Sequence, residues 1–176
     1  MKIDYNKKVM LKIVNEKSNL GKTSMMKIMF ILQQVFSMKL GYNFNIYTYG
    51  PYASKVTDDL EMLIYNNFVD AETYEYKDSS MAYRLKITEQ GKDSIDMLTL
   101  DDERKISKVL TVFGNKTAKE LELDSTIIYT NNIYAKSNWD QTREEIVKDV
   151  YELKPRFTIE TIQSAYDSLE EEGMLS

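Results

Sequence analysis

The chain has 176 residues and a net charge of −5, and 43% of its residues are hydrophobic, which is typical of a folded protein. It contains no cysteine and no histidine. Disulfides, Cys/His zinc sites and catalytic Ser–His or Cys–His pairs are therefore excluded. No apolar run is long enough to span a bilayer, and the N-terminus lacks a signal-peptide pattern. We therefore expect a cytoplasmic protein without a membrane partner.

Charge is unevenly distributed along the chain. Residues 1–50 contain eight lysines and two acidic residues, whereas the remainder contains 15 basic and 26 acidic residues. A basic part beside an acidic part can mark a nucleic-acid-binding face at one end of a protein. The same distribution is compatible with solvated helix surfaces, so charge alone does not identify the partner.

Two helices and a strand are predicted before residue 50. The first helix covers about residues 5–17. The second is capped by Thr23 or Ser24 and ends near Met38, and its apolar residues show the clearest helical spacing in the chain. Residues 42–49 alternate between the two faces of a strand, which we expect to be the third strand of a small sheet.

The stretch 49–69 predicts a helix with clear start and stop signals. Gly50-Pro51 marks the start because proline fits the first helical turn, and Ser54 is a second candidate cap. Asn66-Asn67 can adopt the left-handed conformation that ends a helix. The apolar face between these signals consists of Val56, Leu60, Leu63 and Ile64.

Residues 71–77 and 81–87 predict a β-hairpin with a turn at residues 78–80. In the second strand, apolar residues alternate with Arg84 and Lys86, which gives one buried face and one cationic face. A further helix follows. A helix, a two-stranded ribbon and another helix form the core of a winged helix-turn-helix.

Residues 101–176 predict only helices, and no low-complexity linker separates them from the first half. Their expected N-terminal caps are Thr117, Thr142 with Glu145, and Thr158. The predicted fold is α+β and mostly helical. Residues 1–100 are expected to form a winged helix-turn-helix with a small antiparallel sheet, and residues 101–176 a helical extension packed on the same core.

Several short motifs in this order resemble a known family. A strand that ends in Tyr49-Gly50-Pro51-Tyr52, then Asp58-Asp59-Leu60 and a hairpin, is similar to the YwgA-like winged-helix proteins of bacteria and archaea. That family is similar in turn to the Panacea-type (SocA-like) antitoxin domain, which also has Gly-Pro before a Leu-rich helix. The resemblance implies a winged-helix fold and a regulatory or defence role, without a catalytic residue. Where the family pattern has serine, this chain has Ala53, followed by Ser54.

Binding of double-stranded DNA, as a transcriptional regulator, is the first function that this fold predicts. A helix N-terminus offers free N–H groups to a phosphate, and cations neutralise the backbone. The candidate contacts are Lys22, Lys27, Ser54, Lys55, Thr57, Arg84 and Lys86. Two observations oppose DNA binding: the acidic residues Asp58, Asp59 and Glu61 on the same helix, and a sequence pI of about 5.0.

The alternative is a protein-interaction module of the antitoxin type, which neutralises or presents a partner protein without binding DNA. Tyrosine is a common interface anchor, and the candidates are Tyr49, Tyr52, Tyr74 and Tyr76. Packing in a half-buried sheet also explains these tyrosines. The sequence is also compatible with a homodimer.

Catalysis is not expected. Glu75-Tyr76-Lys77 is similar to a motif of metal-dependent nucleases, but so short an acidic match often arises by chance. The sequence therefore predicts no catalytic residue, no metal and no cofactor.

Overall fold

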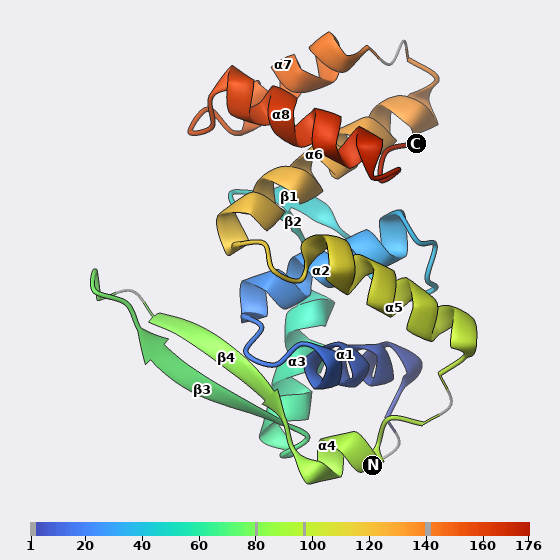
Figure 1. Ribbon diagram of the computed structural model, residues 1–176, viewed down its shortest axis with the longest axis vertical. Coiled ribbons are helices and arrows are strands. Elements are labelled where there is room, and N and C mark those ends of the chain that lie inside the picture. The colour runs from blue at the N-terminus through green and yellow to red at the C-terminus, as the bar shows by residue number, and fades with distance from the viewer. Residues whose placement is uncertain (1–2, 80, 97, 140–141) are drawn as a thin grey trace.

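The computed structural model of the protein describes residues 3–79, 81–96, 98–139 and 142–176. These ranges form an α+β fold that is mostly helical (Figure 1). The helices are α1 (Tyr5–Glu16), α2 (Lys22–Gln34), α3 (Ser54–Tyr65), α4 (Glu89–Asp93), α5 (Leu100–Phe113), α6 (Ala118–Ser137), α7 (Arg143–Leu153) and α8 (Ile159–Glu171). The strands are β1 (Asn45–Tyr47), β2 (Gly50–Tyr52), β3 (Val69–Glu75) and β4 (Met81–Ile87).

The apolar core is centred on α2. Every residue from Ser24 to Leu32 is buried, because α2 has neighbours on all sides: it contacts α3, α5, α6, β2 and β4. The helix α1 packs against α3, α4 and α5, while α7 and α8 pack on α6 and on each other (Figure 1). A single cluster of buried apolar side chains runs from α1 to α8.

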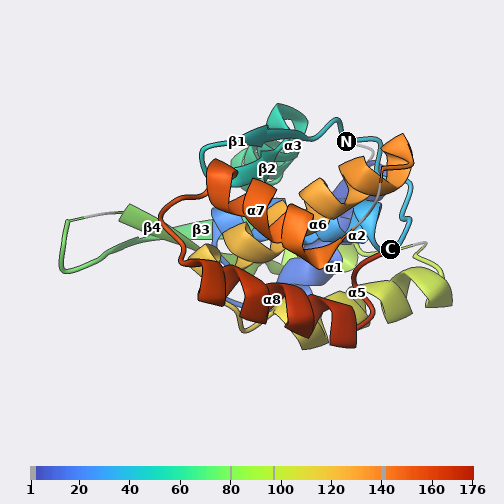
Figure 2. The same cartoon turned by 90° about the horizontal axis from the view of Figure 1, so that it is seen from above.

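The antiparallel pair β3–β4 extends away from the helices, as Figure 2 shows from above. Its register runs from Val69 opposite Ile87 to Glu75 opposite Met81. Only Val69 and Leu85 of the two strands are buried, at the end nearest the core. The predicted turn is present, since Ser79 adopts a φ of 62° and its N–H donates to Tyr76 O at 2.9 Å. Ser80, which the prediction included, lies outside the described residues.

The prediction of a third strand at residues 42–49 beside this hairpin is wrong. The structure has two separate two-stranded sheets, and β1 pairs with β2 (Asn45 opposite Tyr52). The chain reverses there because Gly50 adopts a φ of +89°, which L side chains rarely tolerate. The position beside β4 is taken by Leu20, which forms a single antiparallel bridge with Leu85.

The expected start of α3 is also wrong. Gly50-Pro51 lies in β2, and the helix begins at Ser54, after an N-cap at Ala53 that has no side-chain hydrogen bond. The predicted end is confirmed, because Asn67 adopts a left-handed φ of 59° just beyond α3. The local signals marked the end of this helix correctly but placed its start in a strand.

The bounds of α2 differ from the prediction at both ends. Its N-cap is Gly21 and not Thr23 or Ser24, and the helix ends at Gln34 rather than near Met38. The helix ends there because Ser37 adopts a left-handed φ of 54° and the N–H of Met38 donates to Leu32 O at 3.1 Å. A reciprocal pair of hydrogen bonds then ties the following loop back to α2. Gln33 Nε2 donates to Tyr42 O at 2.8 Å, and Tyr42 N–H donates to Gln33 Oε1 at 2.9 Å.

The predicted caps of the second half are confirmed. Thr117 with Glu120 and Thr142 with Glu145 form capping boxes, and the Thr158 hydroxyl accepts from the N–H of Thr161. Within the described ranges, no helix combines the length and apolar character that a bilayer crossing requires.

Candidate functional site

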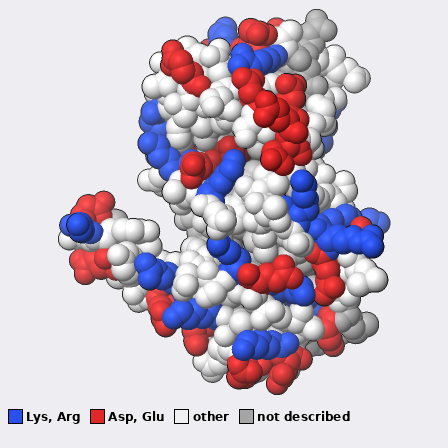
Figure 3. All heavy atoms as spheres, viewed as in Figure 1, with Lys and Arg blue, Asp and Glu red and all other residues white. Residues whose placement is uncertain are grey.

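A cavity with a volume of about 1070 Å³ lies between α2, the β1–β2 hairpin and the start of α6. We call it the cleft. Its lining includes Lys27, Tyr47, Tyr49, Tyr52, Lys119 and Arg156. The space-filling view shows a notch on this side of the molecule, above the projecting β3–β4 hairpin, with cationic and acidic side chains along its edges (Figure 3).

Lys27 is the buried charge of the cleft. Only 2% of this residue is exposed, since α2 runs beneath the β1–β2 hairpin. Its Nζ donates to Pro51 O at 2.7 Å, and none of the ion pairs found among the described residues includes it. Burial, together with repulsion from Lys154, lowers the pKa of Lys27 to about 8.

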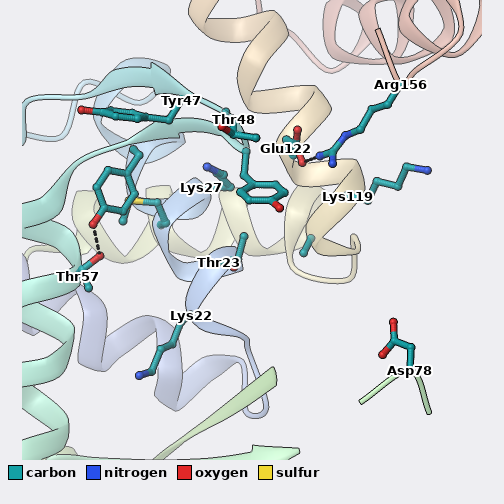
Figure 4. A pocket seen from close by; sticks show the side chains of 15 residues that line it. Lys22, Thr23, Lys27, Tyr47, Thr48, Thr57, Asp78, Lys119, Glu122 and Arg156 are labelled. Carbon is teal, nitrogen blue, oxygen red and sulfur yellow. Dashed lines mark hydrogen bonds and ion pairs between the residues drawn. The ribbon is translucent and has the colours of Figure 1, made fainter. Parts of the chain in front are cut away.

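A group of three charges closes the side of the cleft formed by α6. Glu122 is buried, and its Oε1 lies 3.1 Å from Lys154 Nζ without a well-aligned hydrogen bond. Arg156 forms an ion pair with the other oxygen of Glu122, and the two side chains point toward each other in Figure 4. Lys154 also donates to the carbonyl oxygens of Tyr47 (3.1 Å) and Thr48. This group therefore ties the end of α7 and helix α6 to the β1–β2 turn.

The β1–β2 turn approaches α6 closely. A Cβ added to Gly50 would lie 3.2 Å from Thr126 Oγ1 and 3.3 Å from Glu122 O. Glycine is thus required here for its positive φ and also for space. The close approach fixes the position of the tyrosines on either side of the turn.

Three tyrosines of this hairpin form the outer rim of the cleft. Tyr47, Tyr49 and Tyr52 are 60%, 62% and 36% exposed. The rings of Tyr47 and Tyr52 meet edge to face, with centroids 5.5 Å apart, and the Arg156 guanidinium lies 5.4 Å from the ring centroid of Tyr49. Thr57 of α3 donates its hydroxyl hydrogen to Tyr52 OH at 3.3 Å. The rim is an exposed aromatic surface held by contacts from α3 and from the segment after α7.

Asp59, predicted to repel DNA from the exposed face of α3, instead lies in the core. It is 0% exposed and accepts hydrogen bonds from Asn6 Nδ2 (2.6 Å) and Tyr42 OH (3.0 Å). Lys7 Nζ lies 3.2 Å from it, and Lys55 forms a second ion pair with it. Burial and the neighbouring Asp59 carboxylate raise the pKa of Tyr42. This Asp59 cluster joins α1, α3 and the loop after α2.

The lysines predicted to bind phosphate are engaged with acidic groups or buried. Lys22 Nζ lies 2.6 Å from Glu61 Oε1, and Lys86 Nζ lies 2.9 Å from Glu72 Oε1. The other two are Lys55, paired with Asp59, and Lys27, buried under Pro51. Ser54 is exposed at the first position of α3.

Arg84 and the two tyrosines of the β3–β4 hairpin form a separate group outside the cleft. The rings of Tyr74 and Tyr76 meet edge to face at 5.1 Å, and the Arg84 guanidinium lies 4.1 Å from the ring centroid of Tyr74. None of the described ion pairs includes Arg84. Among the predicted residues, the cleft thus unites Lys22, Lys27, Tyr49, Tyr52 and Thr57, and leaves Ser54, Lys55, Tyr74, Tyr76, Arg84 and Lys86 outside.

Sequence reasoning missed the contributions of α6 and of the segment after α7. These segments contribute Lys119, Glu122, Lys154 and Arg156, which lie more than 60 positions from the β1–β2 hairpin in the sequence. The one available signal was the pair of cations on either side of Pro155, just where α7 ends.

In the described ranges, no group of three or more acidic side chains is placed to hold a metal ion. A scan against models of known protein families finds no match, and a search of curated proteins finds none either. The resemblance to the YwgA-like and Panacea-type families stays a prediction.

Proposed function

We propose that this chain is a protein-interaction module of the antitoxin type, and that the cleft is its binding surface for a partner protein. In this proposal residues 1–100 are a winged helix used to bind protein. The order α1, α2, α3, β3, β4, with the β1–β2 hairpin inserted between α2 and α3, supports this assignment. Leu20, between the first two helices, also pairs beside β4.

The observation that supports the proposal most strongly is the aromatic rim of the cleft. Tyr47, Tyr49 and Tyr52 are all exposed on the β1–β2 hairpin. The rings of Tyr47 and Tyr52 contact each other, and Arg156 lies against the ring of Tyr49. Tyrosine and arginine are enriched among the residues that dominate binding energy at protein interfaces. Tyrosine also offers a large contact area for little loss of rotamer entropy. A rim already held by α3 and Arg156 loses still less entropy when a partner binds.

The ion pairs of the candidate DNA-binding lysines favour protein over DNA as the partner. A phosphate backbone gains affinity by pairing with free cations and releasing counterions. Lys22, Lys55 and Lys86 already have carboxylate partners, so binding DNA would first break those pairs. This cost does not arise at the tyrosine rim.

Co-expression with the product of the neighbouring reading frame tests the proposal. We expect a stable complex in size-exclusion chromatography with light scattering, weakened at least about tenfold by Tyr49→Ala combined with Tyr52→Ala. The matched control is Tyr65→Ala, which removes an 86% exposed tyrosine at the far end of α3. A complex that tolerates the double substitution, or that is lost equally in Tyr65→Ala, would contradict the proposal.

DNA binding is the second candidate, favoured by the geometry of the β3–β4 hairpin. The hairpin projects freely and presents Arg84, while Ser54, Lys55 and Thr57 lie in the first turn of α3. Titration of a labelled duplex at low and at moderate salt tests this candidate. Arg84→Gln is expected to reduce the slope of the logarithm of affinity against the logarithm of salt concentration by about one. Absence of binding even at low salt would eliminate it.

A further inference from the structure

We propose that the partner inserts an acidic side chain into the cleft, where its carboxylate forms an ion pair with the Lys27 ammonium beneath the β1–β2 hairpin. The tyrosines of the rim would hold the residues on either side of that acid. This inference rests on the proposed function and specifies the chemistry of the segment that the cleft accepts.

The main support is that Lys27 is buried and has no counter-ion among the residues that the structure describes. An ammonium has three donors, and the structure assigns one of them, to Pro51 O at 2.7 Å. A buried charge is costly unless it is paired, and large shifts in pKa accompany it. The pKa of Lys27, lowered to about 8, agrees with an incompletely compensated charge. A carboxylate from outside would supply the missing partner.

The charges around Lys27 leave the cleft positive. Glu122 is engaged by both Lys154 and Arg156, so it does not compensate Lys27 as well. Lys119, exposed on the first turn of α6, contributes another positive charge at the mouth, and its Nζ lies 5.5 Å from the ring centroid of Phe157. A single acid entering between these groups therefore meets one cation at the mouth and one at the floor.

The shape of the site favours a side chain over a strand or a nucleic acid. The carbonyl oxygens of Tyr47, Thr48 and Pro51 already accept from lysines, so they are not open to an added strand. A phosphate backbone would bring several negative charges close to Glu122 and Asp78, which also line the cleft. A single carboxylate on an aliphatic stem avoids both difficulties, because the stem can pack against the tyrosine rings.

Proton uptake provides a signature of this ion pair. Lys154 is the charged neighbour that, together with burial, lowers the pKa of Lys27. The other titratable groups that line the cleft with Lys27 are Lys22, Asp78, Lys119, Glu122, Arg156 and the tyrosines Tyr47, Tyr49 and Tyr52. Lys27, with a pKa of about 8, is mostly neutral at a pH of about 8.5, and a bound carboxylate would restore its charge. Binding should then draw up to about 0.8 proton from the buffer.

The experiment is isothermal titration calorimetry. The ligand is a nine-residue peptide with blocked termini, in which a central glutamate lies between two tyrosines and the other residues are glycine and serine. The matched ligand has glutamine at the centre. We expect the glutamate peptide to bind at least about tenfold more tightly, with proton uptake measured in buffers of different ionisation enthalpy. Lys27→Met and Lys27→Gln should both abolish the preference and the uptake, and Lys119→Gln should weaken binding about threefold.

The matched control variant is Lys148→Gln, which removes an exposed positive charge from α7, outside the cleft. It should leave binding unchanged. Equal affinity for the glutamine peptide, or unchanged binding by both Lys27 variants, would overturn the inference. Tighter, Lys27-dependent binding of a single-stranded (dT)₁₀ would overturn it in favour of a nucleic acid.

Failure of this inference can be told apart from failure of the proposed function. If the partner complex requires Tyr49 and Tyr52 but tolerates Lys27→Met, the interaction module stands and the acidic side chain does not. If the glutamate peptide binds through Lys27 but no partner complex forms, the anion site stands and the proposed function fails.

Discussion

Two charges buried on neighbouring helices, Asp59 of α3 and Lys27 of α2, have very different surroundings. Asp59 is 0% exposed and is met by two lysines, an asparagine and a tyrosine hydroxyl. Lys27 is 2% exposed and is assigned a single carbonyl oxygen, on Pro51. The two charges are thus buried to a similar extent, but the charge of Asp59 is stabilised by several polar groups and that of Lys27 by one.

This difference separates a structural charge from one that is available for binding. Breaking a buried ion pair leaves a charge uncompensated and is strongly destabilising, whereas replacing a poorly paired charge with an apolar side chain is often neutral or stabilising. The Asp59 cluster should therefore be needed for folding. Lys27 should be dispensable for folding and needed for binding.

Asp59→Ala should show the largest effect. It removes the common partner of Lys7 and Lys55 and leaves the Lys7 ammonium in the core with only Asp4 nearby. We expect a loss of about 4 kcal/mol in the free energy of unfolding, measured by urea denaturation. Asp58→Ala, at the exposed neighbouring position, is the control and should change stability by less than about 0.5 kcal/mol. Similar losses in the two variants would show that Asp59 has no special role.

Glu122→Gln comes next, because it keeps the shape of the side chain but removes the counter-ion of two cations. Lys154, whose side chain is 4% exposed, would then lie unpaired close to Lys27. The expected loss is about 3 kcal/mol near neutral pH. It should shrink at alkaline pH as Lys154 and Lys27 lose their protons, since burial lowers the pKa of both. A loss that does not vary with pH would argue against an electrostatic origin.

Lys27→Met should act in the opposite direction and raise the free energy of unfolding by about 1–2 kcal/mol near neutral pH. The pKa of Lys27 is lowered to about 8 in the folded protein, so the unfolded chain binds more protons between that pH and the ordinary lysine pKa. Between a pH of about 7 and a pH of about 10, the free energy of unfolding of the wild type should therefore rise relative to that of the variant. The difference between the two proteins should disappear at the upper end of this range. Destabilisation at every pH would identify Lys27 as a structural residue.

Lys86→Gln should have the smallest effect. Lys86 and Glu72 form an ion pair on the exposed β3–β4 hairpin, with side chains 43% and 57% exposed. Exposed pairs of this kind contribute between zero and about 1 kcal/mol. We expect a change of less than about 0.5 kcal/mol in thermal or urea denaturation. A larger loss would show that partial exposure, too, permits a strong ion pair here.

Local signals predicted the mostly helical α+β class, the β3–β4 hairpin and the caps of the second half. Hydroxyl caps such as Thr117 and Thr142 satisfy free N–H groups within one helical turn, so their effect is visible in a short stretch of sequence. The β3–β4 hairpin followed from alternation and a turn in the same way. The error at Gly50-Pro51 arose because the same dipeptide suits a helix start and a strand, and the approach of α6, more than 60 positions away, favours the strand.

The site was predicted only in part, because its chemistry depends on burial and on distant partners. A lysine on α2 and an aspartate on α3 look alike in the sequence whether they face solvent or the core. Lys27 was therefore expected at a DNA surface, and Asp59 on an exposed helix face, whereas both lie buried. Of the four tyrosines that the sequence offered as interface anchors, Tyr49 and Tyr52 line the cleft, whereas Tyr74 and Tyr76 lie outside it. Their role as anchors stays a prediction.

The most direct test is an NMR titration of the Lys27 ammonium, followed through its ¹³Cε resonance in protein with labelled lysine. Lys27→Met identifies the signal. In the free protein we expect a pKa of about 8, and in the complex with the glutamate peptide a rise of at least about one unit, because a carboxylate stabilises the charged form. An unshifted lysine pKa in the free protein, or a value that the peptide does not change, would contradict the assignment of Lys27 as an uncompensated charge that binds the partner's acid.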